Sequence, residues 1–185
     1  MKTVLVVTLL VSSAFAQSPP IGTAVAPGCG ADDAKLEVKT EQGKHPAAQP
    51  DAGKALVYFV EDDSEFASTP KPTTRAGLDG TWVGATHGNS YFYFSVDPGE
   101  HHLCASWQSS VIIGRGHMAA AAHFTAAAGG VYYFEVKNIW ASEPLRRSGE
   151  TTLTPLDSDE GQLLASRVAF STSHPQEKRG QKAVK

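Results

Sequence analysis

The chain has 185 residues, of which 41% are hydrophobic and 19% charged, and its formal net charge is −3 at pH 7. This length suits one domain and excludes a large multidomain enzyme. The apolar fraction is too high for a fully disordered chain, and the charge balance is not basic enough to indicate a nucleic-acid-binding protein.

The N-terminal 16 residues have the pattern of a secretory signal. Lys2 supplies the positive charge, residues 4–11 form a short apolar run, and small residues precede a cleavage point after Ala16. The alternatives are a buried strand or an anchor helix, but Ser12 interrupts the run well short of the ~20 apolar residues that a membrane span needs. We therefore expect residues 1–16 to be removed and the protein to be exported, either to the periplasm or outside the cell.

Two cysteines follow in this exported chain. A Gly/Pro-rich lead-in over residues 17–30 contains Cys29, and Cys104 lies in a later strand-like run. An oxidising compartment and an even cysteine count favour a Cys29–Cys104 disulfide. Two free thiols, an intermolecular bridge or a metal site are the alternatives.

The first strands are indicated by hydrophobic patterning. Residues 35–40 alternate charged and apolar side chains, and residues 55–60 form a continuous apolar run that predicts a central strand. Residues 73–78 and 81–84 flank Asp79-Gly80, and this dipeptide is typical of a tight hairpin turn.

Two further hairpins are expected, and then a loop and a helix. Residues 91–96 and 102–107 flank Asp97-Pro98-Gly99-Glu100, and residues 117–125 precede Gly129-Gly130 and a strand over 131–136. Residues 138–149 are predicted to form a long loop. Asp157 with Glu160 three residues later matches a capping box, so we predict one short helix over about residues 158–168.

A series of short segments occurs in a characteristic order. They are Gly53-Lys54-Ala55-Leu56-Val57-Tyr58-Phe59, Leu78-Asp79-Gly80, Val83-Gly84, Asn89-Ser90-Tyr91-Phe92, Asp97-Pro98-Gly99-Glu100-His101, Gly129-Gly130-Val131-Tyr132-Tyr133-Phe134 and the closing Leu153…Leu156…Glu160-Gly161…Leu164. Over about residues 53–168 they resemble a bacterial family, the domain of unknown function family 2846. The two turns are also similar, more loosely, to PEGA-type surface modules. The resemblance implies an exported, mostly β domain of uncharacterised role, and it carries over no catalytic residues.

Histidines are the candidate metal ligands. The cluster from His101 to His123 contains His102, His117 and His123, which could share one site if their strands lie together. Surface or capping histidines are the alternative, because the spacing matches no established zinc pattern. The chain contains neither a Gly-x-Ser-x-Gly elbow nor a His-Glu-x-x-His zinc signature, so we expect no catalytic residues and no enzymatic activity.

Aromatic side chains are the candidate binding face. Both faces of the strands over 91–96 and 131–136 carry rings, because successive side chains alternate across a strand. One face should belong to the core. The other could be an exposed platform, unless a second sheet or the helix covers it, and the residues proposed for it are Tyr91, Tyr93, Tyr133, Trp82 and Trp107.

The sequence thus predicts a mainly β fold: an antiparallel β-sandwich or open barrel of seven or eight short strands with one short C-terminal helix. Its domain spans residues 31–170 and is followed by a disordered basic tail over 171–185. The expected function is non-enzymatic, as a binding or envelope-associated structural module. We expect no cofactor, no nucleic acid and no transmembrane segment; the partner would be a cell-envelope component, a sugar or a protein. The alternative is a periplasmic metal-binding or metal-dependent hydrolytic protein that uses the histidine cluster.

Overall fold

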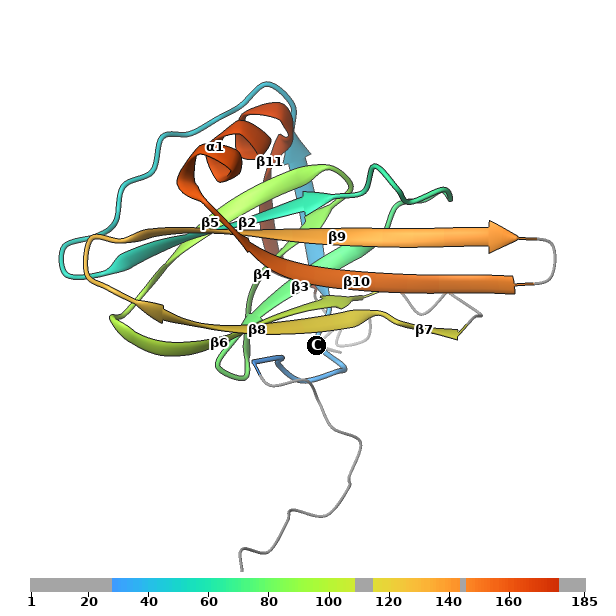
Figure 1. Ribbon diagram of the computed structural model, residues 1–185, viewed down its shortest axis with the longest axis horizontal. Helices are drawn as coiled ribbons and strands as arrows, with labels where there is room; N and C mark the ends of the chain where they lie inside the picture. The colour runs from blue at the N-terminus through green and yellow to red at the C-terminus, as the bar shows by residue number, and fades with distance from the viewer. Residues whose placement is uncertain (1–27, 109–114, 144–145, 177–185) are drawn as a thin grey trace, which may run out of the picture.

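The computed structural model describes residues 28–108, 115–143 and 146–176 (Figure 1). The predicted signal over residues 1–16 and most of the predicted basic tail lie outside these ranges. The strands of the described part are β1 (Leu36–Glu41), β2 (Ala55–Asp62), β3 (Thr73–Leu78), β4 (Thr81–His87), β5 (Ser90–Val96), β6 (Gly99–Trp107), β7 (Arg115–His117), β8 (Ala119–Ala126), β9 (Val131–Glu143), β10 (Arg146–Leu156) and β11 (Ala169–Pro175), and the helix is α1 (Ser158–Arg167).

The strands form two sheets, which confirms the predicted mainly β fold. The larger sheet has the order β1-β11-β5-β2-β9-β10-β7, and the smaller has the order β4-β3-β6-β8. The smaller sheet is wholly antiparallel. The larger sheet is mixed, because the β2–β9, β5–β11 and β7–β10 pairs are parallel. Strand β2 is central, as its apolar sequence predicts.

The main core lies between the two sheets. Its fully buried side chains include Val57 and Phe59 of β2, Phe134 of β9 and Leu103 of β6. The Phe59 and Phe92 rings are 5.7 Å apart at their centroids, and the Phe124 and Phe134 rings are 5.0 Å apart. Burial of these large apolar side chains supplies the main driving force that holds the sheets together.

Only one of the three predicted hairpins is a hairpin. Strands β3 and β4 pair across Asp79 and Gly80, whose φ angles of 50° and 86° are those that the Asp-Gly turn predicts. By contrast, β5 and β6 belong to different sheets, and so do β8 and β9. The predictions of hairpins at 97–100 and 129–130 were therefore wrong. The same local turn residues carry the chain from one sheet to the other.

Two further segments differ from the sequence predictions. Residues 138–149 are not a loop, because β9 and β10 pair from Leu156↔Tyr133 to Arg146↔Glu143. Figure 1 shows this long hairpin extending beyond the rest of the fold. Residues 171–175, which we placed in the disordered tail, belong to β11, because this strand pairs with β1 on one side and β5 on the other.

Helix α1 is confirmed, together with its N-cap. The Asp157 carboxylate accepts hydrogen bonds from the backbone N–H groups of Asp159 and Glu160, at 2.9 Å each. The helix lies on the outer face of the larger sheet, against β9 and β2 (Figure 1). Gly161 is buried in this contact, and a Cβ there would overlap the Tyr133 ring. In the described part of the chain no helix is long and apolar enough to span a bilayer.

Candidate functional site

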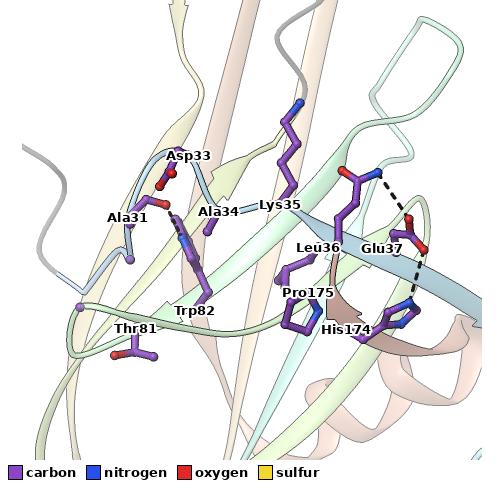
Figure 2. Close-up of a pocket in the computed structure, with 13 residues that line it drawn as sticks. Ala31, Asp33, Ala34, Lys35, Leu36, Glu37, Thr81, Trp82, His174 and Pro175 are labelled. Carbon is purple, nitrogen blue, oxygen red and sulfur yellow. Dashed lines mark hydrogen bonds and ion pairs between the residues drawn. The ribbon is translucent and has the colours of Figure 1, made fainter. Parts of the chain in front are cut away.

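A groove of about 1350 Å³ lies on the described surface. Figure 2 shows it between three segments that are distant in the sequence: residues 30–37, the β3–β4 turn with Trp82, and the end of β11 at His174 and Pro175. Its apolar lining comes from Leu36, Pro175 and the Trp82 edge. Its volume is above the ~300–1,000 Å³ of ordinary small-molecule pockets.

The Cys29–Cys104 disulfide fastens the wall of the groove formed by residues 30–37. This disulfide, which the sequence analysis predicted, joins the N-terminal segment to β6 of the smaller sheet. The β3–β4 turn is held to this N-terminal segment by a hydrogen bond in which the Gly80 N–H donates to the Gly28 carbonyl at 3.2 Å. The groove therefore has a covalently attached wall.

Trp82 and Arg75 hold the same segment further along. The Trp82 indole N–H donates to the Ala31 carbonyl at 2.8 Å (Figure 2), and a Cβ on Gly30 would come within 2.6 Å of the indole ring. The Arg75 guanidinium lies 4.1 Å from the ring centroid and donates to the carbonyl of Ala34 at 2.7 Å. Trp82 is therefore a structural support of the groove, with one ring face taken by Arg75.

Side chains of both charge signs line the opposite rim. His174 Nε2 is 3.3 Å from a Glu37 carboxylate oxygen, and the Gln176 amide donates to the other Glu37 oxygen at 3.4 Å. Lys35 and Thr81 are exposed and also line the groove (Figure 2). Across its two sides the groove offers an ammonium, a carboxylate, an amide, a hydroxyl and an imidazole.

At the start of β1, beside the groove, the backbone of Leu36 is hydrogen-bonded to the side-chain amide of Gln108. The Leu36 N–H donates to the Gln108 side-chain carbonyl at 2.6 Å, and the Gln108 NH₂ donates to the Leu36 carbonyl at 2.8 Å. A neighbouring peptide group in a sheet would make the same pair of bonds. Gln108 therefore occupies the backbone groups of Leu36 in the way that a neighbouring strand would.

The predicted aromatic platform is not one surface. Tyr91, Tyr93 and Tyr133 do gather on the outer face of the larger sheet around Tyr58, with the Tyr58 and Tyr133 ring centroids 4.7 Å apart. However, α1 covers this face, and His45 of the β1–β2 connection stacks on Tyr91. Tyr91 is only 2% exposed and Tyr133 only 7%.

Trp82 and Trp107 lie elsewhere. Trp82 supports the groove, whereas Trp107 is only 6% exposed and packs with Phe66 and Trp140. The prediction of a single exposed face was wrong, because the helix and the second sheet each cover part of the aromatic set. Burial, together with the neighbouring Tyr58 and Tyr93, raises the pKa of Tyr91 to about 12.

The histidine cluster is only partly assembled. His102 and His123 lie opposite each other on β6 and β8. His101 instead places Nδ1 2.7 Å from an Asp79 carboxylate oxygen and Nε2 2.7 Å from the Asp97 carbonyl. The His117 side chain lies outside the described part. Within the described residues no group of three or more His, Cys, Asp or Glu side chains is arranged to hold a metal ion.

A buried polar cluster between the sheets was not predicted as a site. Asn138 of β9 donates through Nδ2 to Glu61 at 2.7 Å, to Asp63 at 2.8 Å and to the Thr74 hydroxyl at 3.0 Å. Its Oδ1 accepts from the Trp107 indole N–H and from the Thr151 hydroxyl. Glu61 and Asp63 are both fully buried.

The described fold and its disulfide define a class: a disulfide-linked β domain of two stacked sheets with a single helix packed on the larger one. The family model described as "Protein of unknown function (DUF2846)" matches residues 51–149, more than half of the chain. The chain belongs to this family, as its motifs indicated. No curated protein and no solved structure matches it. The buried polar cluster lies inside the matched range except for Thr151, whereas most residues that line the groove lie outside it.

Proposed function

We infer that this chain is an exported, non-enzymatic binding module that takes a polypeptide segment of an envelope component into the groove. The observation that carries the proposal is the groove itself, with the wall fastened by the Cys29–Cys104 disulfide. Export is supported by the signal pattern of residues 1–16 and by the disulfide, because such bonds persist in oxidising compartments.

The chemistry of the rim favours a polypeptide over other ligands. A polypeptide presents amides, charges of both signs and aliphatic carbon, and the rim offers partners for each of these through Glu37, Lys35, Gln176 and Leu36. A sugar would normally stack on an open aromatic face, but Arg75 occupies a face of the Trp82 ring.

The contacts of the titratable groups in the groove support the proposal of a binding role. In the described part of the chain His174 Nε2 lies 3.3 Å from a Glu37 carboxylate oxygen, and this pair presents a charged contact to a bound segment. A carboxylate, an imidazole and an amide held together at a rim form a polar contact surface, which would fix the orientation of a bound segment.

A peptide-display selection against the oxidised protein tests this proposal. Selected peptides should bind the unmodified chain and the Thr125→Arg variant equally, and they should lose at least about tenfold in affinity for the Thr81→Arg variant. The two positions are matched, since both are exposed threonines on strands of the smaller sheet and only Thr81 lines the groove. Equal binding to both variants, or selection of glycans but not peptides in a parallel screen, would refute the proposal.

A further inference from the structure

The 63–72 segment, which joins β2 to β3, is docked over the end of the core by a small set of contacts. Phe66 of this segment is buried between Trp107 and Trp140, with ring centroids 5.4 and 6.3 Å away. The Ala67 N–H donates to the Trp140 carbonyl, and the Trp140 N–H donates to the Glu65 carbonyl. These contacts cover two buried tryptophans.

The segment begins at a pair of buried carboxyl groups. Glu61 accepts from Asn138 and from the Thr74 hydroxyl through Oε1, and Asp63 accepts from the same Asn138 amide through Oδ1. The remaining oxygens, Glu61 Oε2 and Asp63 Oδ2, are buried and have no hydrogen-bond partner in the described part of the chain. A buried carboxylate oxygen without a partner is costly, and protonation removes most of that cost.

The surrounding charges do not neutralise the pair. Lys71 is the nearest cation that acts on Asp63, but its ammonium donates to the backbone carbonyls of Asp63 and Phe66, at 2.9 and 2.6 Å. Asp62 adds a further negative charge close by. From the other elements, β4 contributes the Thr86 hydroxyl, and β6 and β10 contribute Trp107 and Thr151 through Asn138. These last three groups are neutral.

We propose that Glu61 and Asp63 form a proton-controlled latch, which holds the 63–72 segment closed over Trp107 and Trp140 while the pair is protonated and releases it when the pair ionises. The geometry supports this because Asp63 is both a member of the pair and the first residue of the segment. Its own N–H donates to the Asn89 side chain at 2.7 Å, which is a second contact that holds Asp63 in the closed form.

The direction of the effect follows from linkage. Burial raises the pKa of Asp63 from 3.8 to about 6, although the Asn138 amide and Lys71 lower it, and burial together with the Asp63 charge raises the pKa of Glu61 well above its usual range. Opening returns both groups to water, so the open form binds fewer protons at intermediate pH. The opening equilibrium therefore increases as the pH rises, by roughly thirtyfold between pH 4 and 6 for Asp63 alone.

Amide hydrogen exchange of residues 63–72 in the full, oxidised chain tests the latch. After correction for intrinsic exchange, protection of this segment should fall by roughly a hundredfold or more between pH 4 and 7. In Asp63→Asn the fall should be smaller by the Asp63 contribution, and the remaining fall, contributed by Glu61, should begin above about pH 4.5. In Glu61→Gln the fall should level off above about pH 6. The matched control is Glu65→Gln, an exposed carboxylate of the same segment, which should behave as the unmodified chain.

Protection that does not change with pH in the unmodified chain would overturn the proposal, and so would a full fall that persists in Asp63→Asn. If the Asp63 variant does not fold, tryptophan fluorescence of the unmodified chain gives an independent measurement, because Phe66 would leave Trp107 and Trp140 on opening. A fluorescence change that tracks the loss of protection supports the latch. A constant fluorescence over the same pH range contradicts it.

Discussion

Reduction of the Cys29–Cys104 disulfide should destabilise the protein by about 4.5 kcal/mol. The bond closes a loop of 75 residues, and the chain-entropy relation for a loop of this length gives that value at 25 °C. Reduction stabilises the unfolded chain by increasing its conformational entropy. It changes the folded protein less, because Trp82 and Arg75 still hold the N-terminal segment there. Reduction removes no heavy atom from the buried position of Cys104, so it creates no large cavity.

Urea unfolding of the oxidised and reduced protein measures this difference. With a slope of about 2 kcal/mol per molar urea, the midpoint should fall by about 2 M on reduction. The double variant Cys29→Ala/Cys104→Ala should unfold at a similarly low midpoint, and it should not respond to reductant. A shift below about 0.5 M would refute the argument, because it would mean that the loop is already constrained in the unfolded chain.

Four further perturbations test other parts of the fold. Gly161→Ala should destabilise by about 1–3 kcal/mol in thermal unfolding, despite the better helix propensity of alanine, because the new methyl group would overlap the Tyr133 ring. Asp157→Ala should cost about 1 kcal/mol through the lost cap, with helix content measured by circular dichroism. Asn138→Ala should cost about 3 kcal/mol or more in urea unfolding, because it leaves two buried carboxyl groups without their shared donor. Relative to Asp63→Asn, the unmodified chain should lose about 3 kcal/mol of stability as the pH rises from 4 to above 6, since the folded state holds its proton more tightly than the unfolded chain.

Elements that depend on neighbouring residues were predicted well from the sequence. The cap at Asp157, the turn at Asp79 and Gly80 and the apolar strand β2 each follow from chemistry within a few positions. The disulfide was also predictable, because two cysteines allow one intramolecular bond. These features require no knowledge of which strands come together.

Partner choice between strands was not predictable in the same way. The turn at Asp97 to Gly99 has residues as suitable for a hairpin as Asp79-Gly80, yet β5 pairs with β2 and β11 while β6 pairs with β3 and β8. Both arms of that turn carry enough apolar side chains to fit either arrangement. The choice is made by packing across the whole core, which local patterning does not contain.

Asn138 and the groove illustrate the same limit for function. A polar residue after an apolar strand indicates a loop, but Asn138 is buried because partners on β2, β3, β6 and β10 satisfy its amide. The groove is built from residues near both chain ends and from one turn, and only Trp82 among them was a candidate. No signal within a single segment indicates such a site.

The central claim, that the groove binds a polypeptide, is tested most directly by nuclear magnetic resonance. A peptide from the display selection is titrated into the labelled, oxidised protein, and backbone amide shifts are followed. The account predicts that the largest changes fall on residues 30–37, 80–82 and 174–176. Changes concentrated instead around the Tyr58–Tyr133 cluster, or on the exposed face of β8, would contradict it.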